Sequence, residues 1–363
     1  MNFIFRTCLL LLLLFSFTTM RTEASTSPVK SWNITFSKSV NMSSLTKQNV
    51  YIQAPSGQLH PIAVTQKSAS TITITPLAPY RETRTHTIVV SDAASVSGEL
   101  LQKPFTYMFS FTPTEKATWI WNAYTLTAEN AQFLIDEHVT KVYVQVEPAI
   151  PDETYAAFFE LLSQHHIDIY ALEGFAELQW QQANKTASYL QWVAKFQAKY
   201  GYLRGIHVDI EPYTHPSWHT HEQQLLQAYF DYIIMLQQYS KQHTLRFEID
   251  IPFWFDELTY TNKFGQGNVA HWLIDATDAV TVMAYHNEAH AIITLVAEEY
   301  AYAQSQSKNI TIAIETAPSL EDSLISFSEQ TPSQLYEAMH LVHSTYNVPI
   351  AIHYLQTWQH MLK

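Results

Sequence analysis

The sequence predicts an α/β protein of two domains, a (β/α)8 TIM barrel preceded by a small all-β sandwich. Hydrophobic and polar residues alternate with period two between residues 31 and 112, as in half-buried strands. After residue 117, eight short β-branched segments alternate with segments of helical periodicity. Residues 118–363 come close to the roughly 250 residues that such a barrel needs. The two domains are therefore expected at 28–112 and 118–363, with a linker at 113–117.

The alternating runs of the first domain begin with Trp32, Ile34 and Phe36 and continue at 71–75, 87–90 and 105–112. Its Trp-x-Ile-x-Phe opening, the Pro-x-x-Pro-Tyr segment before a Thr-Ile-Val-Val run, and the closing Phe-Ser-Phe-Thr resemble the bacterial Ig-like modules of S-layer and other exported cell-envelope proteins. The resemblance implies a domain that positions or spaces its neighbour. No cluster of polar residues in it indicates chemistry.

The barrel strands are predicted at 118–122, 141–146, 167–172, 203–210, 245–251, 279–285, 309–315 and 348–354. Helices are predicted at 128–138, 153–165, 187–200, 223–242, 289–305 and 332–346. A doubly wound open sheet is the alternative, but it would have fewer strands and usually a glycine-rich first turn. The number of strands and the length favour the barrel.

The composition excludes several classes of protein. Of the 363 residues, 47% are hydrophobic and 15% charged, so the chain can bury a large core. The net charge is −13 and no cluster of Lys and Arg offsets it, which argues against a nucleic-acid partner. With seven glycines and neither a GxGxxG nor a GxxxxGK[ST] string, a nucleotide cofactor is not expected. We expect no cofactor of any kind.

Residues 1–24 are predicted to be a secretory signal peptide. Arg6 precedes an apolar run from Cys8 to Phe17 that is too short for a permanent membrane helix. Removal of this segment removes Cys8, the one cysteine, so disulfides and thiolate chemistry are not expected. No later segment has the length of a membrane helix. The protein is therefore expected to be secreted, either extracellular or associated with the cell envelope.

The predicted barrel strands end in acids and aromatic residues, at the rim where such barrels carry their chemistry. The candidate residues are Trp119, Glu147, Glu173, His207, Asp209, Glu211, Asp250, Trp254, Met283, Tyr285, His286, Glu315, His353 and Tyr354. Trp121 lies on the same face as Trp119, and core filling is the favoured interpretation for it. Aromatic faces stack on sugar rings and carboxylic acids protonate glycosidic oxygens, so this rim predicts a polysaccharide or oligosaccharide substrate.

The segment from Gly205 to Tyr213 carries the strongest signal. Strand alternation places His207, Asp209 and Glu211 on one inward face, and repulsion between close carboxylates raises the pKa of one, as a general acid requires. The string resembles the fourth-strand Asp-x-Asp-x-Glu of family 18 glycoside hydrolases, the chitinase-like barrels, with His207 in place of the first Asp. In that family the Glu is the acid, which implies this role for Glu211.

The same resemblance continues on strands six and eight. Met283-Ala284-Tyr285 matches a Met-x-Tyr whose hydroxyl helps to hold the reacting N-acetyl group, while His286 stands where the family has an Asp. Tyr354 stands where the family usually has a Trp. The resemblance implies a substrate-assisted scheme in which Glu211 protonates the leaving oxygen while Asp209 and Tyr285 orient the acetamido group.

Two other functions remain open at this stage. In the first, Glu211 is the acid/base and Glu315 the nucleophile of a two-carboxylate retaining glycosidase, which needs the carboxyls about 5–5.5 Å apart. In the second, the barrel binds carbohydrate or serves as a cell-wall scaffold without catalysis, as His207 and His286 would allow. Asp209 and Glu211 could also form a structural ion pair. The 17 histidines include no HExxH motif, and no metal is expected.

Overall fold

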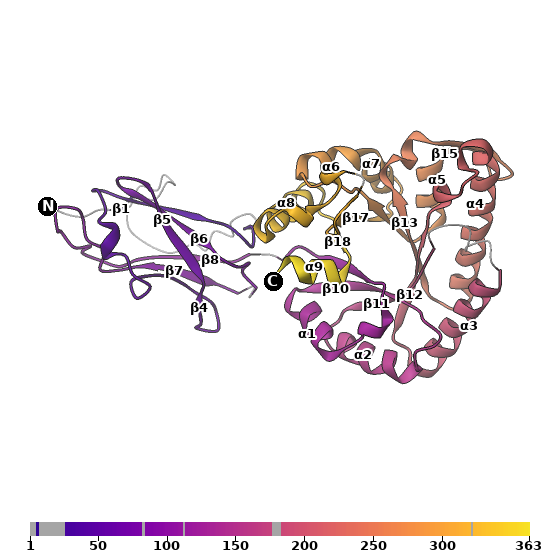
Figure 1. The fold of residues 1–363 in the computed structure, drawn as a ribbon, viewed down its shortest axis with the longest axis horizontal. Helices are drawn as coiled ribbons and strands as arrows, with labels where there is room; N and C mark the ends of the chain where they lie inside the picture. Colours follow the sequence, from indigo (N-terminus) through magenta and orange to yellow (C-terminus); the bar gives the residue numbers. More distant parts are fainter. Residues whose placement is uncertain (1–4, 7–25, 82–83, 112, 176–182, 321) are drawn as a thin grey trace. The chain divides into compact units, whose positions relative to one another are not determined.

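The computed structural model describes residues 5–6, 26–81, 84–111, 113–175, 183–320 and 322–363 (Figure 1). The chain divides into two compact units, one made of Met1–Pro113 and Pro332–His340 and the other of Thr114–Thr331 and Leu341–Lys363. Apart from Phe5–Arg6, which form the short strand β1, the predicted signal peptide lies outside the described residues. Within the described ranges, none of the helices has both the length and the apolar character needed to cross a bilayer.

The N-terminal unit consists of two four-stranded antiparallel sheets, with strand orders β1-β2-β6-β5 and β4-β3-β7-β8. The strands beyond β1 are β2 (Trp32–Phe36), β3 (Val50–Gln53), β4 (Leu59–His60), β5 (Ile62–Ser68), β6 (Thr71–Pro76), β7 (His86–Val90) and β8 (Phe105–Phe109). Alternation buries one face of each sheet: in β6 every second residue is buried, including Ile72 and Ile74. This confirms the predicted sandwich. Strands β3 to β5 were not predicted, because β5 is polar and exposed over its second half.

The second unit is built around a closed barrel of eight parallel strands in the order β9-β10-β11-β12-β13-β16-β17-β18. The strands are β9 (Lys116–Ile120), β10 (Val139–Gln145), β11 (Asp168–Phe175), β12 (Leu203–Ile210), β13 (Arg246–Pro252), β16 (Ala279–Met283), β17 (Asn309–Glu315) and β18 (Ile350–His353). The predicted barrel is confirmed. Two strands, β12 and β17, have their predicted bounds, and the other strand ends differ from the prediction by at most three residues.

Helices follow the strands along the chain and lie outside them (Figure 1). They are α1 (Ala128–Asp136), α2 (Asp152–Gln164), α3 (Ala183–Tyr200), α4 (Trp218–Gln242), α5 (Val269–Ala276), α6 (Ala289–Leu295), α7 (Ala297–Ser305), α8 (Pro332–Tyr346) and α9 (Leu355–Met361). The predicted helix at 289–305 is two helices that meet at Val296. The short α5, which follows the hairpin of β14 (Thr259–Asn262) and β15 (Gly265–Asn268), was not predicted.

The interior of the barrel combines small and large side chains. Ala117, Ala313 and Ala351 come from neighbouring strands and leave room for Trp119, Tyr143 and Tyr170 opposite them. Trp121, Tyr285 and Tyr354 are partly buried and pack against this cluster. All three follow directly or closely after a strand, so they lie toward the end of the barrel where the strands finish.

Candidate functional site at the carboxyl end of the barrel

The strand ends bring four of the predicted acids to one end of the barrel. Asp209 lies in β12 and Asp250 in β13, while Glu315 ends β17 and pairs in register with His353 of β18. Glu211 follows β12 directly and begins the turn that leads into the 3-10 helix at Pro212–Thr214. Parallel strands in a barrel end at a common rim, which is why residues far apart in sequence meet here.

Asp209 is the least compensated of these acids. Its Oδ1 is buried and has no hydrogen-bond partner among the described residues. Burial, followed by the charges of Asp250 and Glu211, raises the pKa of Asp209 well above its ordinary value. The Tyr213 hydroxyl donates a short hydrogen bond to Oε1 of Glu211. No ion pair among the described residues joins Asp209 or Glu211 to Lys or Arg.

Asp250 is held by residues beneath it. Trp119 Nε1 donates to Asp250 Oδ2 over 3.0 Å, and His207 Nε2 lies 2.8 Å from Oδ1. Burial lowers the pKa of His207 to about 3, so this contact joins a neutral imidazole to a carboxyl group rather than two opposite charges. The pKa of Asp250 is raised well above its ordinary value, chiefly by burial. Tyr143 stacks on the His207 ring at 3.8 Å between centroids.

Trp119 and His207 therefore differ from the expectation that they would contact a ligand. Both are sealed, with 1% and 0% of their surfaces exposed. They point inward as strand alternation requires, but they lie one layer below the rim, under Asp250. Trp121, for which core filling was favoured, is the more exposed of the two tryptophans and lies above Trp119 at the end of the strand.

Glu315 is fully engaged by its neighbours. Its Oε1 accepts hydrogen bonds from the backbone N–H groups of Thr316 (2.7 Å) and Ala317 (2.6 Å). Its Oε2 lies 2.7 Å from His353 Nδ1. Burial alone would lower the pKa of His353, but the hydrogen bond and the charge of Glu315 outweigh it, so the pKa is raised. On the other side of the ring, Trp121 Nε1 donates to His353 Nε2 over 2.9 Å.

The remaining rim candidates lie at different distances from this group. The Tyr285 ring lies 5.9 Å from that of His353 between centroids, and burial, followed by the charges of Glu315, Asp209 and other acids, raises the pKa of Tyr285 well above its ordinary value. Trp254 packs against Tyr213 at 5.1 Å between ring centroids. Met283 is buried, Tyr354 and His286 are half-buried, and His286 Nδ1 accepts from the backbone of Glu288 at 3.1 Å.

Glu173 and Glu147 form a separate acidic group on β11 and after β10. Burial raises the pKa of Glu173 to about 8, although Gln145 donates to its carboxyl. Glu147 turns back onto its own loop, where Oε1 accepts from the Ala149 N–H at 3.1 Å. Sequence reasoning did not identify Tyr213 or Gly174 as site residues. Only the register of neighbouring strands, which places Gly174 beside Asp209, reveals the last of these.

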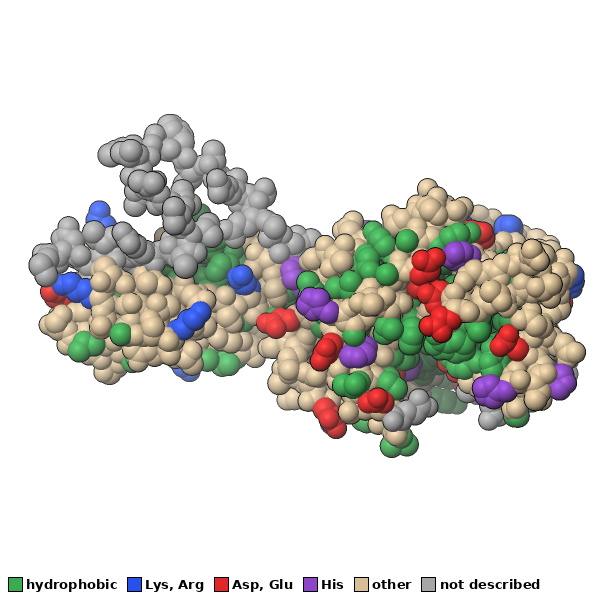
Figure 2. Space-filling view, turned by 90° about the horizontal axis from the view of Figure 1, so that it is seen from above, with side chains coloured by type: hydrophobic (Ala, Val, Ile, Leu, Met, Phe, Trp, Pro, Cys, Tyr) green, Lys and Arg blue, Asp and Glu red, His purple; other side chains and the backbone are tan. Residues whose placement is uncertain are grey.

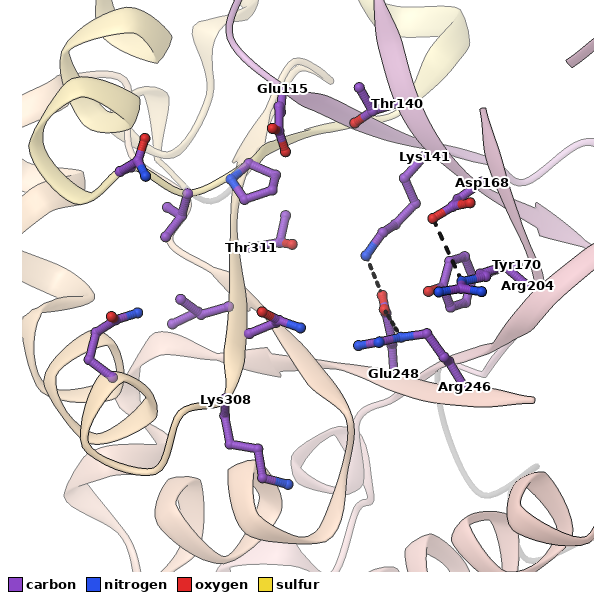
Figure 3. A pocket seen from close by; sticks show the side chains of 16 residues that line it. Glu115, Thr140, Lys141, Asp168, Tyr170, Arg204, Arg246, Glu248, Lys308 and Thr311 are labelled. Atoms are coloured by element: carbon purple, nitrogen blue, oxygen red, sulfur yellow. Dashed lines mark hydrogen bonds and ion pairs between the residues drawn. The ribbon is translucent and has the colours of Figure 1, made fainter. Parts of the chain in front are cut away.

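A cavity of about 450 Å³ lies at the opposite end of the strands (Figure 3). Two of its acids, Glu248 and Asp168, are paired with bases. Lys141 Nζ lies 2.6 Å from Glu248 Oε2, Arg246 Nε lies 3.6 Å from Glu248 Oε1, and Arg204 lies 4.0 Å from Asp168. The buried acid at this end of the barrel, Glu248, is thus compensated by bases.

On the face of the second unit drawn in Figure 2, patches of Asp, Glu and His side chains border hydrophobic ones, and the basic side chains lie at the edge. Within the part of the chain that the structure describes, no three His, Cys, Asp or Glu side chains are grouped so that they could hold a metal ion. The rim residues described above are carboxyl groups, imidazoles and aromatic rings.

Residues 15–113 match the family model of the bacterial Ig-like domain, in agreement with the sandwich of the N-terminal unit. Among curated proteins, no sequence matches the chain. The same unit is similar to domains 1–6 of the surface layer protein SbsC, with 22% identity and a TM-score of 0.21 over 24% of this chain and 13% of that one.

The barrel is similar to solved glycoside hydrolases at low identity. A GH18 chitinase from Pseudoalteromonas aurantia is 10% identical, with a TM-score of 0.47 over 69% of this chain and 97% of that one. The spore cortex-lytic enzyme SleL of Bacillus megaterium is 12% identical, with a TM-score of 0.41 over 70% and 64% of the two chains. The fold class is thus an Ig-like domain followed by a TIM barrel.

Proposed function

We propose that the barrel hydrolyses glycosidic bonds of a cell-wall or extracellular polysaccharide, with Glu211 as the general acid and Asp209 and Tyr285 assisting. One observation carries this proposal: among the described residues, the buried Oδ1 of Asp209 has no hydrogen-bond partner and the carboxyl has no basic ion-pair partner, while Glu211 and Asp250 raise its pKa. A structural carboxylate of this burial would be bonded or paired. An uncompensated group instead awaits a ligand that completes its hydrogen bonds.

The chemistry assigned to each residue follows from its contacts. Glu211 protonates the glycosidic oxygen, and the acetamido oxygen of the substrate attacks the anomeric carbon. Asp209 and Asp250 repel one another, so they favour holding a proton between them, and Asp209 can bond to the acetamido group as charge develops on it. The raised pKa of Tyr285 keeps its hydroxyl protonated, so it donates to the same group.

The contacts of Glu315 favour this scheme over the two-carboxylate one. A nucleophilic carboxylate needs a free oxygen directed at the anomeric carbon. Both oxygens of Glu315 are occupied, one by two backbone N–H groups and the other by His353. Glu315 is therefore better suited to orient His353 than to attack the sugar.

The test is a screen of the full chain on chitin, peptidoglycan and other α- and β-linked glycans, with wild type compared with Glu211→Gln. We expect hydrolysis by the wild type and a loss of at least about 100-fold in the variant, because general acid catalysis contributes about 10² to 10⁴-fold. Glu257→Gln, which changes an exposed carboxyl on the 3-10 helix at Phe253–Glu257, is the matched control and should retain full turnover.

A carbohydrate-binding protein without turnover is the second candidate, because His207 is neutral and sealed at a position where the resemblance calls for an acid. It would bind a glycan of the screen equally well before and after Glu211→Gln and hydrolyse none. Turnover by the wild type that is lost in Glu211→Gln would exclude it.

We further propose that the protein is exported and that the Ig-like domain holds the barrel at the cell envelope. The match of residues 15–113 to the bacterial Ig-like domain supports this role. Fractionation of producing cells into medium, envelope and cytoplasm tests it. Recovery of the full chain in the cytoplasm would contradict it.

A further inference from the structure

Trp121 lies across the mouth of the barrel. It follows β9 directly, yet the far edge of its ring reaches Gly174 on β11, beyond the intervening strand β10. A Cβ atom on residue 174 would lie 2.5 Å from Cζ3 of Trp121, closer still to Cη2, and 3.5 Å from the Cβ of Asp209. Residue 174 must therefore lack a side chain for the indole to occupy this place, and the indole lies beside Asp209.

The other edge of the indole is fixed by a chain of hydrogen bonds. Trp121 Nε1 can only donate, so His353 Nε2 accepts and carries no proton. The ring proton of His353 is then on Nδ1, which donates to Glu315 Oε2. Glu315 is held in turn by the N–H groups of Thr316 and Ala317. Each member of this chain fixes the orientation of the next, from the backbone after β17 to the indole.

We propose that the sugar beside Asp209 stacks on the indole of Trp121, and that His353 and Glu315 are the positioning residues that fix the orientation of this indole. The inference rests on the proposed function and assigns the sugar contact to a residue of the first barrel strand. A rigid, half-exposed indole next to the acid group offers the flat apolar face that a sugar ring packs against. Trp119 cannot do so, since it is buried beneath Asp250.

The first experiment measures binding of tetra-N-acetylchitotetraose by calorimetry to the full chain carrying Glu211→Gln, which prevents turnover. Adding Trp121→Ala should raise Kd about tenfold or more, and Trp121→Phe should recover part of the loss because it keeps a ring face. The matched control is Trp192→Ala, since Trp192 is also half-buried and donates from Nε1 to Asp152 over 2.9 Å, but lies on the outer helix α3. Equal Kd values for Trp121→Ala and the control would overturn the proposal.

A glycine substitution tests the same contact without removing the tryptophan. Gly174→Ala should weaken binding about as much as Trp121→Ala, because the new methyl group displaces the indole. Gly267→Ala is its control: a Cβ there would meet Tyr260 at 3.4 Å, an ordinary contact. Full affinity in a folded Gly174→Ala protein would overturn the proposal. If the parent Glu211→Gln protein binds no glycan of the screen, the proposed function itself fails. If the parent binds and Gly174→Ala keeps full affinity, only the role of Trp121 fails.

The positioning role has a pH signature. Protonated His353 cannot accept from Trp121, so affinity should fall as the pH drops through the pKa of His353, which Glu315 raises above its ordinary value. In His353→Gln, whose amide oxygen can still accept but does not titrate, this step should disappear. Glu315 of β17, Asp209 of β12, Asp250 of β13 and Tyr285 after β16 also interact with His353, and any steps that they cause remain in the variant. An unchanged pH profile in His353→Gln would contradict the role of His353.

Discussion

The two ends of the barrel interior hold similar side chains under opposite electrostatic conditions. At the amino end, Glu248 is buried, yet Lys141 lowers its pKa below the ordinary value by outweighing the effect of burial. At the carboxyl end, Asp209 is surrounded by acids and its pKa is raised. Compensated charges close one end of the barrel, whereas uncompensated charges at the other end destabilise the fold and are available for a ligand.

The largest expected effect on stability is at the compensated end. Glu248→Gln leaves Lys141 and Arg246 beside a neutral amide, and loss of one partner from a buried ion pair costs roughly 3 kcal/mol. Urea denaturation should show this loss, while turnover per folded molecule on a glycan from the screen stays at the wild-type value. Glu153→Gln removes the same kind of pair, Glu153 with Lys199, from the surface and should show no measurable loss. Equal stability of the two variants would refute the comparison.

The same type of substitution at the other end of the barrel should increase the free energy of unfolding instead of lowering it. Asp209→Asn removes a carboxyl group whose ionisation is disfavoured by burial and two neighbouring acids, so we expect a gain of about 1–2 kcal/mol in the free energy of unfolding at pH 7, together with loss of turnover. Asp168→Asn, which affects the half-exposed pair with Arg204 at the amino end, is the control and should change neither quantity much. A destabilised Asp209→Asn protein would mean that the carboxylate is compensated after all.

The barrel itself was predictable because each strand is short, β-branched and separated from the next by a segment with helical spacing. Strands β12 and β17 were placed residue by residue. The hairpin of β14 and β15 and helix α5 were not predicted, because they are short additions between β13 and β16 rather than part of the alternating pattern. In the sandwich, β5 escaped prediction because its exposed second half has no buried face to impose alternation.

The candidate site was only partly predictable. Strand alternation could place Asp209 and Glu211 inward, since that depends on neighbouring residues alone. Depth within the barrel depends on stagger between strands, so sequence could not distinguish the sealed Trp119 from the half-buried Trp121. The contact of Trp121 with Gly174 joins β9 to β11 across another strand, and no local pattern encodes it.

The smallest effect tests whether uncompensated burial extends along the rim to Glu173. Its pKa is raised from 4.5 to about 8, chiefly by burial, so the folded state keeps a proton that the unfolded chain releases. This contribution to stability is complete below pH 4.5 and is lost as the pH rises toward 8. Glu173→Gln cannot ionise, so its stability advantage over the wild type should grow by about 1 kcal/mol between pH 6 and 7.

Thermal or urea unfolding of Glu173→Gln and wild type across this pH range measures the difference directly. Glu257→Gln, with an exposed carboxyl, should run parallel to the wild type. A parallel course for Glu173→Gln would mean that Glu173 is ionised in the folded protein. Uncompensated burial at the carboxyl end would then be limited to the acids around Asp209 and would not extend to Glu173.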